Sequence, residues 1–279
     1  MRSKLFVPCS RPEFFDKALV SDADALSFDL EDSVPVEGKA AARERLAAFL
    51  DSDAARQTAK QIIVRVNDPR SPDFAADLDA LRGCDVGMLN IPKIDDAPGI
   101  IAAAHAITET RSEPVELLVN IETPRALARA ADIARAHPGV AGLQVGLNDL
   151  FAVLGAERHD PRNVHTALWQ VRIGAAEASV FACDGAWPDL RDAAGFSAEA
   201  GMAHALGYIG KTCIHPSQIA AANRIFGQDR DLAAARRLVA AARLAAADGR
   251  GAFLFEGRMV DRPMIVRAQA QLDRAGDAA

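Results

Sequence analysis

The feature that most constrains the fold is a regular alternation between short apolar runs and longer stretches of helical periodicity. Eight runs rich in apolar and β-branched residues are typical of strands: Lys4–Cys9, Ala25–Leu30, Gln61–Asn67, Val86–Ile91, Val115–Ile121, Val140–Leu147, Ser179–Cys183 and Leu206–Lys211. The segments that follow them are typical of helices: Glu13–Val20, Lys39–Leu50, Pro72–Leu81, Ile100–Glu109, Pro124–Ala136, Arg162–Glu177, Asp189–Ala205 and Pro216–Phe226. Eight strand-then-helix units within about 225 residues predict a (β/α)8 TIM barrel of the α/β class. A doubly wound open sheet is the alternative, because periodicity does not show whether a sheet closes.

The chain beyond residue 226 departs from this pattern. It contains an alanine-rich helical segment (Leu232–Ala247), a short extended piece (Ala252–Gly257) and a final helix (Pro263–Arg274). These elements are too few for a second full domain. We therefore expect a catalytic barrel over residues 1–226 and a short C-terminal helical extension over residues 227–279.

Composition narrows the class of protein. Half of the 279 residues are hydrophobic, which is enough for a large core and excludes a disordered chain. The net charge is −6, no basic block occurs and only 5% of residues are aromatic, so no nucleic-acid partner is expected. No apolar run approaches the roughly 20 residues of a membrane span, and the first residues lack the apolar core of a signal peptide. Four cysteines, far apart in the sequence, fit the reduced thiols of a cytoplasmic protein.

Polar residues share one face of several predicted strands. Because successive side chains of a strand point to opposite sides, Asp29, Arg65, Glu122 and Gln144 each lie opposite a fully apolar face. The apolar faces are expected beneath the helices. The polar faces are expected in the lumen of a barrel, where residues at the C-terminal ends of strands are typically catalytic.

Two carboxylates end neighbouring predicted strands. Glu122 follows the fifth strand and Asp149 follows the sixth. The pair has the outline of a Mg²⁺ site, because Mg²⁺ is commonly held by one or two carboxylates together with water and substrate. The alternative is two independent structural roles, with Glu122 as a solvated loop carboxylate and Asp149 as the N-cap of a helix.

Arg65 lies between valines in its strand. A guanidinium in such a run must be paired or must face a wet cavity. It can neutralise Asp29 or Glu31, or it can grip a substrate carboxylate and stabilise an enolate, and these roles are compatible. Asp29, Glu31 and Asp32 place three acids within four residues. Carboxylates this close together repel one another. Functional sites use such repulsion to shift pKa values, and solvated loops tolerate it.

Other chemistries have less support in the sequence. Lys93 ends the fourth predicted strand and shares a face with Leu89 and Ile91, so it is expected outside the lumen, which argues against a lysine-dependent aldolase. The alternative is that Lys93 turns inward once the strand ends. His215 follows the eighth predicted strand, and a lone histidine there is more often structural than catalytic. No glycine-rich nucleotide-binding pattern and no serine-hydrolase motif is visible.

A series of motifs along nearly the whole chain matches one family in order. The motifs are Leu5-Phe6-Val7-Pro8, Asp29-Leu30-Glu31-Asp32-Ser33-Val34, Val64-Arg65-Val66-Asn67, Ile91-Pro92-Lys93, Ile121-Glu122-Thr123, Gly146 with Asp149-Leu150, Gly210-Lys211, Ile214-His215-Pro216-Ser217-Gln218 and Gly257-Arg258-Met259-Val260-Asp261-Arg262-Pro263. The series resembles the citrate lyase β-subunit-like family, the branch of the HpcH/HpaI aldolase superfamily that includes malyl-CoA and citramalyl-CoA lyases.

The resemblance implies a TIM barrel that assembles as a homotrimer or homohexamer and uses Mg²⁺ to cleave a 3-hydroxyacyl thioester into an acyl thioester and a 2-keto acid. Its carrier would be coenzyme A or an acyl-carrier protein. Glu122 and Asp149 would be the metal ligands, with Glu122 also near the substrate. Arg65 would bind the substrate and stabilise the enolate. Asp32 would be a catalytic residue in the outer shell of the metal. Asp261 would be the acid/base, supplied by the C-terminal extension of a neighbouring subunit.

The resemblance further implies that Asp29 and Glu31 surround the metal site without binding the metal. One departure concerns Cys9, which stands where the family usually has glycine, so we expect an altered approach of the thioester. Two other functions stay open. A thioester hydrolase could use the same Mg²⁺ site on a malyl-type substrate, and a non-catalytic subunit is also conceivable, although the presence of all the implied site residues weighs against it.

Overall fold

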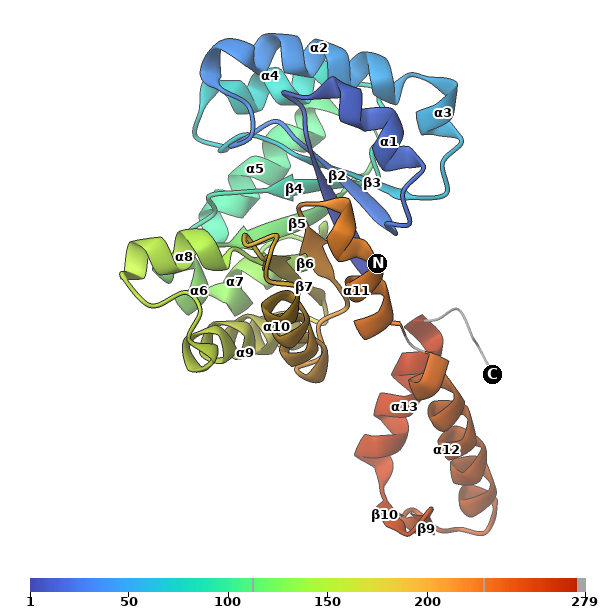
Figure 1. Ribbon diagram of the computed structural model, residues 1–279. Helices are drawn as coiled ribbons and strands as arrows, with labels where there is room; N and C mark the ends of the chain where they lie inside the picture. The colour runs from blue at the N-terminus through green and yellow to red at the C-terminus, as the bar shows by residue number, and fades with distance from the viewer. Residues whose placement is uncertain (112, 228, 275–279) are drawn as a thin grey trace. The chain divides into compact units, whose positions relative to one another are not determined.

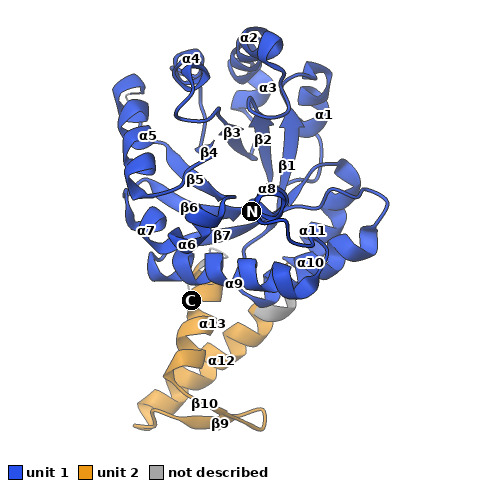
Figure 2. Cartoon of the chain, turned by 90° about the vertical axis from the view of Figure 1, so that its left-hand side faces the viewer, with its two compact units in different colours: residues 1–226 blue, residues 227–279 orange. Residues whose placement is uncertain are grey.

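The computed structural model describes residues 1–111, 113–227 and 229–274. The chain divides into two compact units, Met1–Phe226 and Gly227–Ala279 (Figure 2). Every helix in the described ranges is too short or too polar to cross a lipid bilayer.

The first unit is a closed barrel of eight parallel strands in sequence order, which confirms the predicted (β/α)8 fold and excludes the open sheet (Figure 1). The strands are β1 (Ser3–Pro8), β2 (Ala25–Asp29), β3 (Gln61–Arg65), β4 (Met88–Ile91), β5 (Glu116–Ile121), β6 (Val140–Val145), β7 (Phe181–Ala186) and β8 (Lys211–Cys213). Closure is visible in the register of the first and last strands, where Ser3 pairs with Lys211 and Leu5 with Cys213.

Helices and short 3₁₀ turns connect the strands. The helices are α1 (Phe15–Leu19), α2 (Lys39–Leu50), α3 (Asp53–Arg56), α4 (Pro72–Ala80), α5 (Ala97–Thr110), α6 (Pro124–Ala128), α7 (Ala130–Arg135), α8 (Leu147–Leu154), α9 (Pro161–Glu177), α10 (Ala193–Ala205) and α11 (Ile219–Ile225). The 3₁₀ turns are η1 (Pro12–Phe14), η2 (Val36–Gly38) and η3 (Pro216–Gln218). The local sequence sets where helices α5, α6 and α10 begin, because the side chains of Asp96, Thr123 and Asp192 accept hydrogen bonds from N–H groups in the first turns of these helices.

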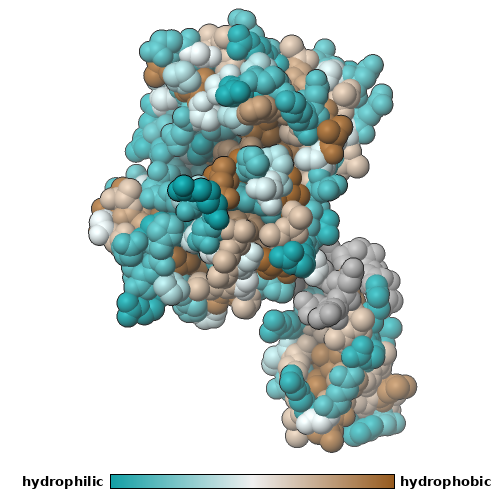
Figure 3. All heavy atoms as spheres, in the orientation of Figure 1, coloured by the Kyte–Doolittle hydropathy of each residue, from teal (hydrophilic) through white to brown (hydrophobic). Residues whose placement is uncertain are grey.

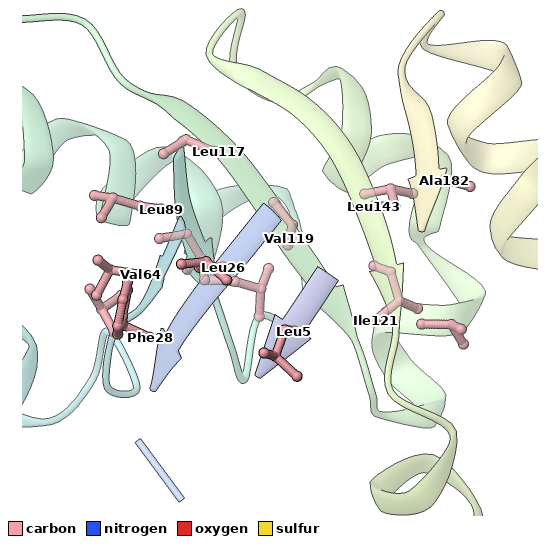
Figure 4. Close-up of a cluster of buried hydrophobic side chains, with 14 of the residues drawn as sticks. Leu5, Leu26, Phe28, Val64, Leu89, Leu117, Val119, Ile121, Leu143 and Ala182 are labelled. Carbon is pink, nitrogen blue, oxygen red and sulfur yellow. The ribbon is translucent and has the colours of Figure 1, made fainter. Parts of the chain in front are cut away.

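Side-chain alternation along the strands separates two cores, as the sequence predicts. Outward-facing side chains such as Leu26, Val64, Val119 and Leu143 pack in the large cluster between strands and helices (Figure 4). Inward-facing Ala25, Ile63, Met88 and Leu118 form a small apolar plug at the N-terminal end of the lumen. The ring of Phe181 packs against this plug and occupies the space where a side chain at Gly142 would lie. The lumen is therefore sealed at one end and polar toward the other.

Several predicted boundaries differ from the structure by a few residues, and two of these differences have a clear local cause. The eighth strand was expected at Leu206–Lys211, but β8 begins only at Lys211. The apolar residues before it end α10 and form a loop: Leu206 is the C-cap, and Gly207 adopts a positive φ of 89° that reverses the chain. The sixth strand was expected to reach Leu147, but it stops at Val145 and α8 begins directly at Leu147.

The second unit is a helical pair with a small hairpin. Helices α12 (Asp229–Ala247) and α13 (Arg262–Arg274) pack through Ala235, Val239, Ala268 and Leu272. Strands β9 (Phe253–Phe255) and β10 (Arg258–Val260) form an antiparallel hairpin between them. The predicted extended piece corresponds to β9, whereas β10 was missed because it is only three residues long and two of them are exposed.

Candidate active site

A cavity of about 280 Å³ lies at the C-terminal mouth of the barrel. Strands β1, β3, β5, β6, β7 and β8 contribute to its walls, and so do the first turn of α8 and the segments that follow β2, β5, β6 and β8. Its lining residues are Phe6, Asp32, Arg65, Asn120, Glu122, Gln144, Val145, Gly146, Leu147, Asn148, Asp149, Ala186, Thr212 and Ile214. The mouth of a TIM barrel is where catalytic groups are found, so this cavity is the candidate active site.

Glu122 lies at the end of β5 with its side chain 2% exposed. The main-chain N–H of Lys93 donates to its Oε1 at 2.7 Å, and Asn120 Nδ2 donates to its Oε2 at 3.1 Å. Burial raises the pKa of Glu122, the neighbouring charge of Asp149 adds to this, and the hydrogen bond and charge of Lys93 oppose it. Gly146 leaves room for this carboxylate, because a Cβ there would lie 2.5 Å from the Cβ of Glu122.

Asp149 lies in the first turn of α8 and is exposed to the same cavity. The N-cap position of α8 is occupied by Gly146, so the alternative that Asp149 is an N-cap is wrong. Its carboxylate is close enough to Glu122 to raise that residue's pKa.

The two carboxylates fit a divalent cation of the Mg²⁺ class. Among the described residues, no group of three or more histidine, cysteine, aspartate or glutamate side chains is arranged around a common metal position. Mg²⁺ needs no such cage, because one or two carboxylates with water and substrate complete its octahedron. A bound cation would also relieve the repulsion between Glu122 and Asp149.

Arg65 ends β3 and projects into the mouth. Its Nε and Nη2 donate to the two oxygens of Asp29 at 2.7 and 2.8 Å, and its Nη1 lies 2.8 Å from Glu31 Oε2. Burial raises the pKa of Asp29, but the charge and hydrogen bonds of Arg65 outweigh it and hold the pKa below its usual value. The structural and the functional interpretations of Arg65 are thus compatible: one edge of the guanidinium is anchored by acids, and the side chain still lines the cavity.

Glu31 and Asp32 differ in their surroundings. Glu31 is buried, and burial together with the charges of Asp32 and Glu122 raises its pKa to about 8, despite the opposing charges of Arg65 and Lys93. Asp32 lines the cavity and is 56% exposed, 3.6 Å from Arg65 Nη1. The structure therefore brings Asp29, Glu31 and Asp32 together around one guanidinium.

Strand alternation misplaced Lys93, and the alternative that it turns inward after the strand is confirmed. Its ammonium lies 3.5 Å from Glu31, 3.9 Å from Asp32 and 4.0 Å from Glu122, on the mouth side of the barrel. Strand alternation fails here because β4 ends at Ile91 and Lys93 adopts a positive φ of 56°. This turn aims both its N–H and its ammonium at the carboxylates.

Several mouth and lumen residues were missed by the sequence analysis. Lys4 is fully buried and its ammonium donates to Gln144 Oε1. Asn90 donates from Nδ2 to Asn120 Oδ1 at 2.8 Å, and Asn120 in turn supports Glu122. Strand alternation could have identified Lys4 and Asn90 as lumen residues, because both lie opposite the apolar faces of their strands, as Arg65 does.

Two residues considered in the sequence analysis, Cys9 and His215, have structural roles. Cys9 is fully buried in the apolar cluster outside the barrel and lines no part of the cavity, so it cannot meet a thioester. His215 accepts the N–H of Ser217 at 3.2 Å and caps η3.

Asp261 belongs to the second unit. It is exposed and lies between β10 and α13, and its main-chain carbonyl accepts the N–H of Ile265 at 3.2 Å. Both units thus contain a residue that the sequence analysis connects with catalysis.

Comparisons with known proteins agree over the whole chain. A sequence model described as HpcH/HpaI aldolase/citrate lyase matches residues 2–216. A citrate lyase subunit beta-like protein of Deinococcus radiodurans is 38% identical, with 98% of this chain and 96% of the relative covered. An L-malyl-CoA/beta-methylmalyl-CoA lyase of Cereibacter sphaeroides is 32% identical, with 98% and 94% covered.

A solved structure is also similar. The protein CitE of Mycobacterium tuberculosis, in complex with magnesium, acetoacetate and coenzyme A, superposes with a TM-score of 0.77 at 34% sequence identity. The match covers 99% of this chain and 100% of that one. The similarity therefore extends beyond the barrel into the C-terminal unit.

Proposed function

The chain belongs to the HpcH/HpaI aldolase/citrate lyase family, and from that premise and the geometry of the mouth we propose that it is a Mg²⁺-dependent carbon–carbon lyase. Its substrate is a 3-hydroxyacyl thioester of the citryl, malyl or citramalyl type, and its products are an acyl thioester and a 2-keto acid. The observation that carries the proposal is a single cavity lined by two mutually repelling carboxylates, Glu122 and Asp149, and by the guanidinium of Arg65.

Glu122 and Asp149 hold the metal in this proposal. Bound Mg²⁺ supplies Lewis acidity, which lowers the pKa of the substrate hydroxyl and stabilises the developing keto carbonyl. Glu122 is held in place for this role by the N–H of Lys93 and by Asn120. The magnesium in the similar CitE structure supports this assignment.

Arg65 stabilises the enolate. When the bond between C2 and C3 breaks, its electron pair passes to C2 and the thioester becomes an enolate. Asp29 and Glu31 hold the guanidinium in a fixed orientation, so it needs no reorganisation when this charge develops. The charges of these acids also keep the pKa of Arg65 above its usual value, so the side chain stays cationic.

In the cleavage direction Asp261 protonates C2 of the enolate, while the proton of the substrate hydroxyl leaves to solvent. In condensation Asp261 removes a proton from C2. We infer that it acts on the site of a neighbouring subunit in a homotrimer or homohexamer. The second unit supports an oligomer, because several large apolar side chains on it are exposed: Leu244, Leu254, Met259, Met264 and Val266. Hydrophobic atoms are visible on the face of this unit shown in Figure 3, and apolar surface of this kind is often covered by a partner.

The thioester arm has a suitable path beside the cavity. A mainly apolar groove of about 270 Å³ shares Phe6 and Ile214 with the cavity and is also lined by Leu5, Pro8 and Phe14. Such a groove fits the extended thiol arm of coenzyme A or of an acyl-carrier protein. The four free cysteines support our inference that the enzyme acts in the reducing cytoplasm.

A substrate panel tests the reaction. Citryl-, malyl- and citramalyl-CoA are each incubated with Mg²⁺ or with EDTA, and all products are identified by mass spectrometry. We expect an acyl thioester and a 2-keto acid from at least one substrate, with Mg²⁺ only. Free thiol with an intact hydroxy acid would instead identify a thioester hydrolase, and no turnover would favour a non-catalytic subunit.

Subunit mixing tests the role of Asp261. Asp261→Ala retains Glu122, and Glu122→Ala retains Asp261, so two inactive proteins should regain part of the activity after subunit exchange. Native mass spectrometry verifies that mixed oligomers have formed. If mixed oligomers form but activity is not regained, Asp261 either acts within its own chain or has only a structural role at the start of α13.

A further inference from the structure

Lys4 places a positive charge inside the barrel, directly beneath the cavity. The side chain projects from β1 into the lumen and is 0% exposed. Its ammonium donates to Gln144 Oε1 and lies 4.8 Å from the centre of the Phe6 ring. Both contacts, Gln144 and Phe6, line the cavity, whereas Lys4 itself does not.

This charge has no direct acidic partner. Among the described residues, no carboxylate lies within ion-pair distance of the Lys4 ammonium, and the longer-range charge of Asp29 only partly offsets the cost of its burial. The other fully buried lysine, Lys211, binds Asp184 at 2.7 Å and Glu199 at 2.8 Å. Buried charges are normally paired in this way, because an isolated ion loses its hydration. Burial lowers the pKa of Lys4 only to about 8, so the side chain is still mainly cationic at neutral pH. A partner for Lys4 is therefore expected from outside the chain.

Gln144 connects this charge to the cavity. A lysine ammonium can only donate, so the carbonyl oxygen of Gln144 must face Lys4. Thr212 Oγ1 also approaches this oxygen, at 3.4 Å. The amide nitrogen of Gln144 makes no hydrogen bond in the described part of the chain and belongs to a side chain that lines the cavity. Its two N–H donors are thus available to a bound molecule.

We propose that Lys4 and Gln144 form an anion-selecting floor of the cavity, and that this floor selects thioesters whose keto-acid half carries a second carboxylate. The inference rests on the proposed lyase function. The hydroxyl and first carboxylate of the substrate are used by the metal ligands, and the charge of Arg65 is already offset by Asp29 and Glu31. The charge of Lys4 is what remains to attract a further anion, and Gln144 supplies the donor that touches it.

Citryl-CoA and citramalyl-CoA are a matched pair for the test. They differ only in whether the carbon that becomes the keto carbon carries a carboxymethyl or a methyl group, and cleavage gives oxaloacetate or pyruvate. We expect the wild type to cleave citryl-CoA with the higher kcat/KM. Lys4→Met keeps roughly the length of the side chain and removes its charge. It should lower the preference for citryl-CoA by about ten- to a hundredfold, the scale of the attraction between unit charges several ångströms apart in a protein interior.

A second measurement does not depend on turnover. Fresh oxaloacetate and pyruvate are compared for their effect on the melting temperature of the Mg²⁺-loaded protein, with Arg162→Met as the control. Arg162 is a surface cation, 89% exposed, that lines neither the cavity nor the groove, so its loss should leave the discrimination between the two keto acids unchanged. Lys4→Met should lose the stronger stabilisation by oxaloacetate. It should also raise the melting temperature without ligand, because it removes an uncompensated buried charge.

The outcomes separate the two proposals. A wild type that cleaves none of citryl-, malyl- and citramalyl-CoA refutes the lyase, while the melting experiment still decides whether the floor selects a second carboxylate. Equal stabilisation by oxaloacetate and pyruvate, or an unchanged preference in Lys4→Met with a lower melting temperature, would show that Lys4 is only a structural residue of the lumen.

Discussion

Two clusters of charged side chains in the barrel have opposite charge balances. The mouth cluster contains the cations Arg65 and Lys93 and five carboxylates, those of Asp29, Glu31, Asp32, Glu122 and Asp149. The α10 cluster, between β7, β8 and α10, contains the cations Lys211 and Arg158 and the two carboxylates of Asp184 and Glu199. The first cluster has three more carboxylates than cations, and the second has equal numbers of both.

The balance distinguishes a structural cluster from a site. In the α10 cluster, Glu199 accepts from Arg158 at 2.7 Å and from Lys211 at 2.8 Å, so each charge has a partner within the chain. Burial and a neighbouring acid raise the pKa of Asp184 in the α10 cluster, as they raise those of Glu31 and Glu122 in the mouth cluster, but only in the mouth cluster do the carboxylates outnumber the cations. Such unrelieved repulsion weakens a fold and is retained where a ligand relieves it. Charge balance, rather than the number of ion pairs, therefore identifies the site.

The largest expected effect comes from removing the metal ligands of the mouth cluster. Glu122→Gln and Asp149→Asn should each abolish Mg²⁺ binding in calorimetric titration and reduce activity to the level seen in EDTA. Glu116→Gln is the matched control, because Glu116 is exposed at the other end of β5. The fold should remain intact, since each change removes a charge from an already repulsive cluster. Unchanged Mg²⁺ affinity in both site variants would contradict the assignment.

Breaking the α10 cluster should affect stability instead. Lys211→Met leaves Asp184 buried without a cation, and the loss of one partner from a buried ion pair costs about 3–5 kcal/mol. Urea unfolding in Mg²⁺-free buffer measures this loss. Arg135→Met removes a half-exposed cation from pairs with Asp132 and Glu177 and should cost less than about 1 kcal/mol. Equal effects of the two changes would refute a structural role for the cluster.

Replacing the guanidinium of the mouth cluster tests its geometry. Arg65→Lys keeps the positive charge but loses the two-point grip on Asp29, so the cation is no longer fixed beside the enolate. We expect kcat to fall by about 10²–10³ and Mg²⁺ affinity to stay nearly unchanged. Arg70→Lys, at an exposed arginine, is the control. A kcat within a few-fold of wild type would show that Arg65 serves only to neutralise its acidic neighbours.

The smallest expected effect is a pH dependence of stability. Burial raises the pKa of Glu31 to about 8 in the folded protein. Between the usual value and about 8 the folded state holds more protons than the unfolded state, so stability falls as pH rises through this window. Without Mg²⁺, Glu31→Gln should therefore be more stable than wild type by about 1–2 kcal/mol near pH 8 and by less near pH 5. Urea unfolding at both pH values measures this, and the same difference at each would contradict it.

The predictability of the site varied with distance from strand ends. Alternation along β2, β3 and β5 correctly placed Asp29, Arg65 and Glu122 toward one mouth, because a strand fixes the direction of each side chain. It failed at Lys93, where the chain has left β4 through a left-handed residue. The eighth strand was predicted too early in the chain, because an apolar run cannot reveal whether it ends a helix or forms a strand.

The sequence by itself determined the alternation of strands and helices, the inward and outward faces of the strands, and the family to which the chain belongs. These properties follow from local periodicity and from motifs that can be read in order. Only the tertiary structure decided which charges are compensated. Lys4 and Lys211 are both lysines in apolar strands, yet one faces the lumen without an acid and the other faces α10 with two. Compensation depends on groups far apart in the sequence, such as Lys4 and Gln144, and barrel closure is what brings them together.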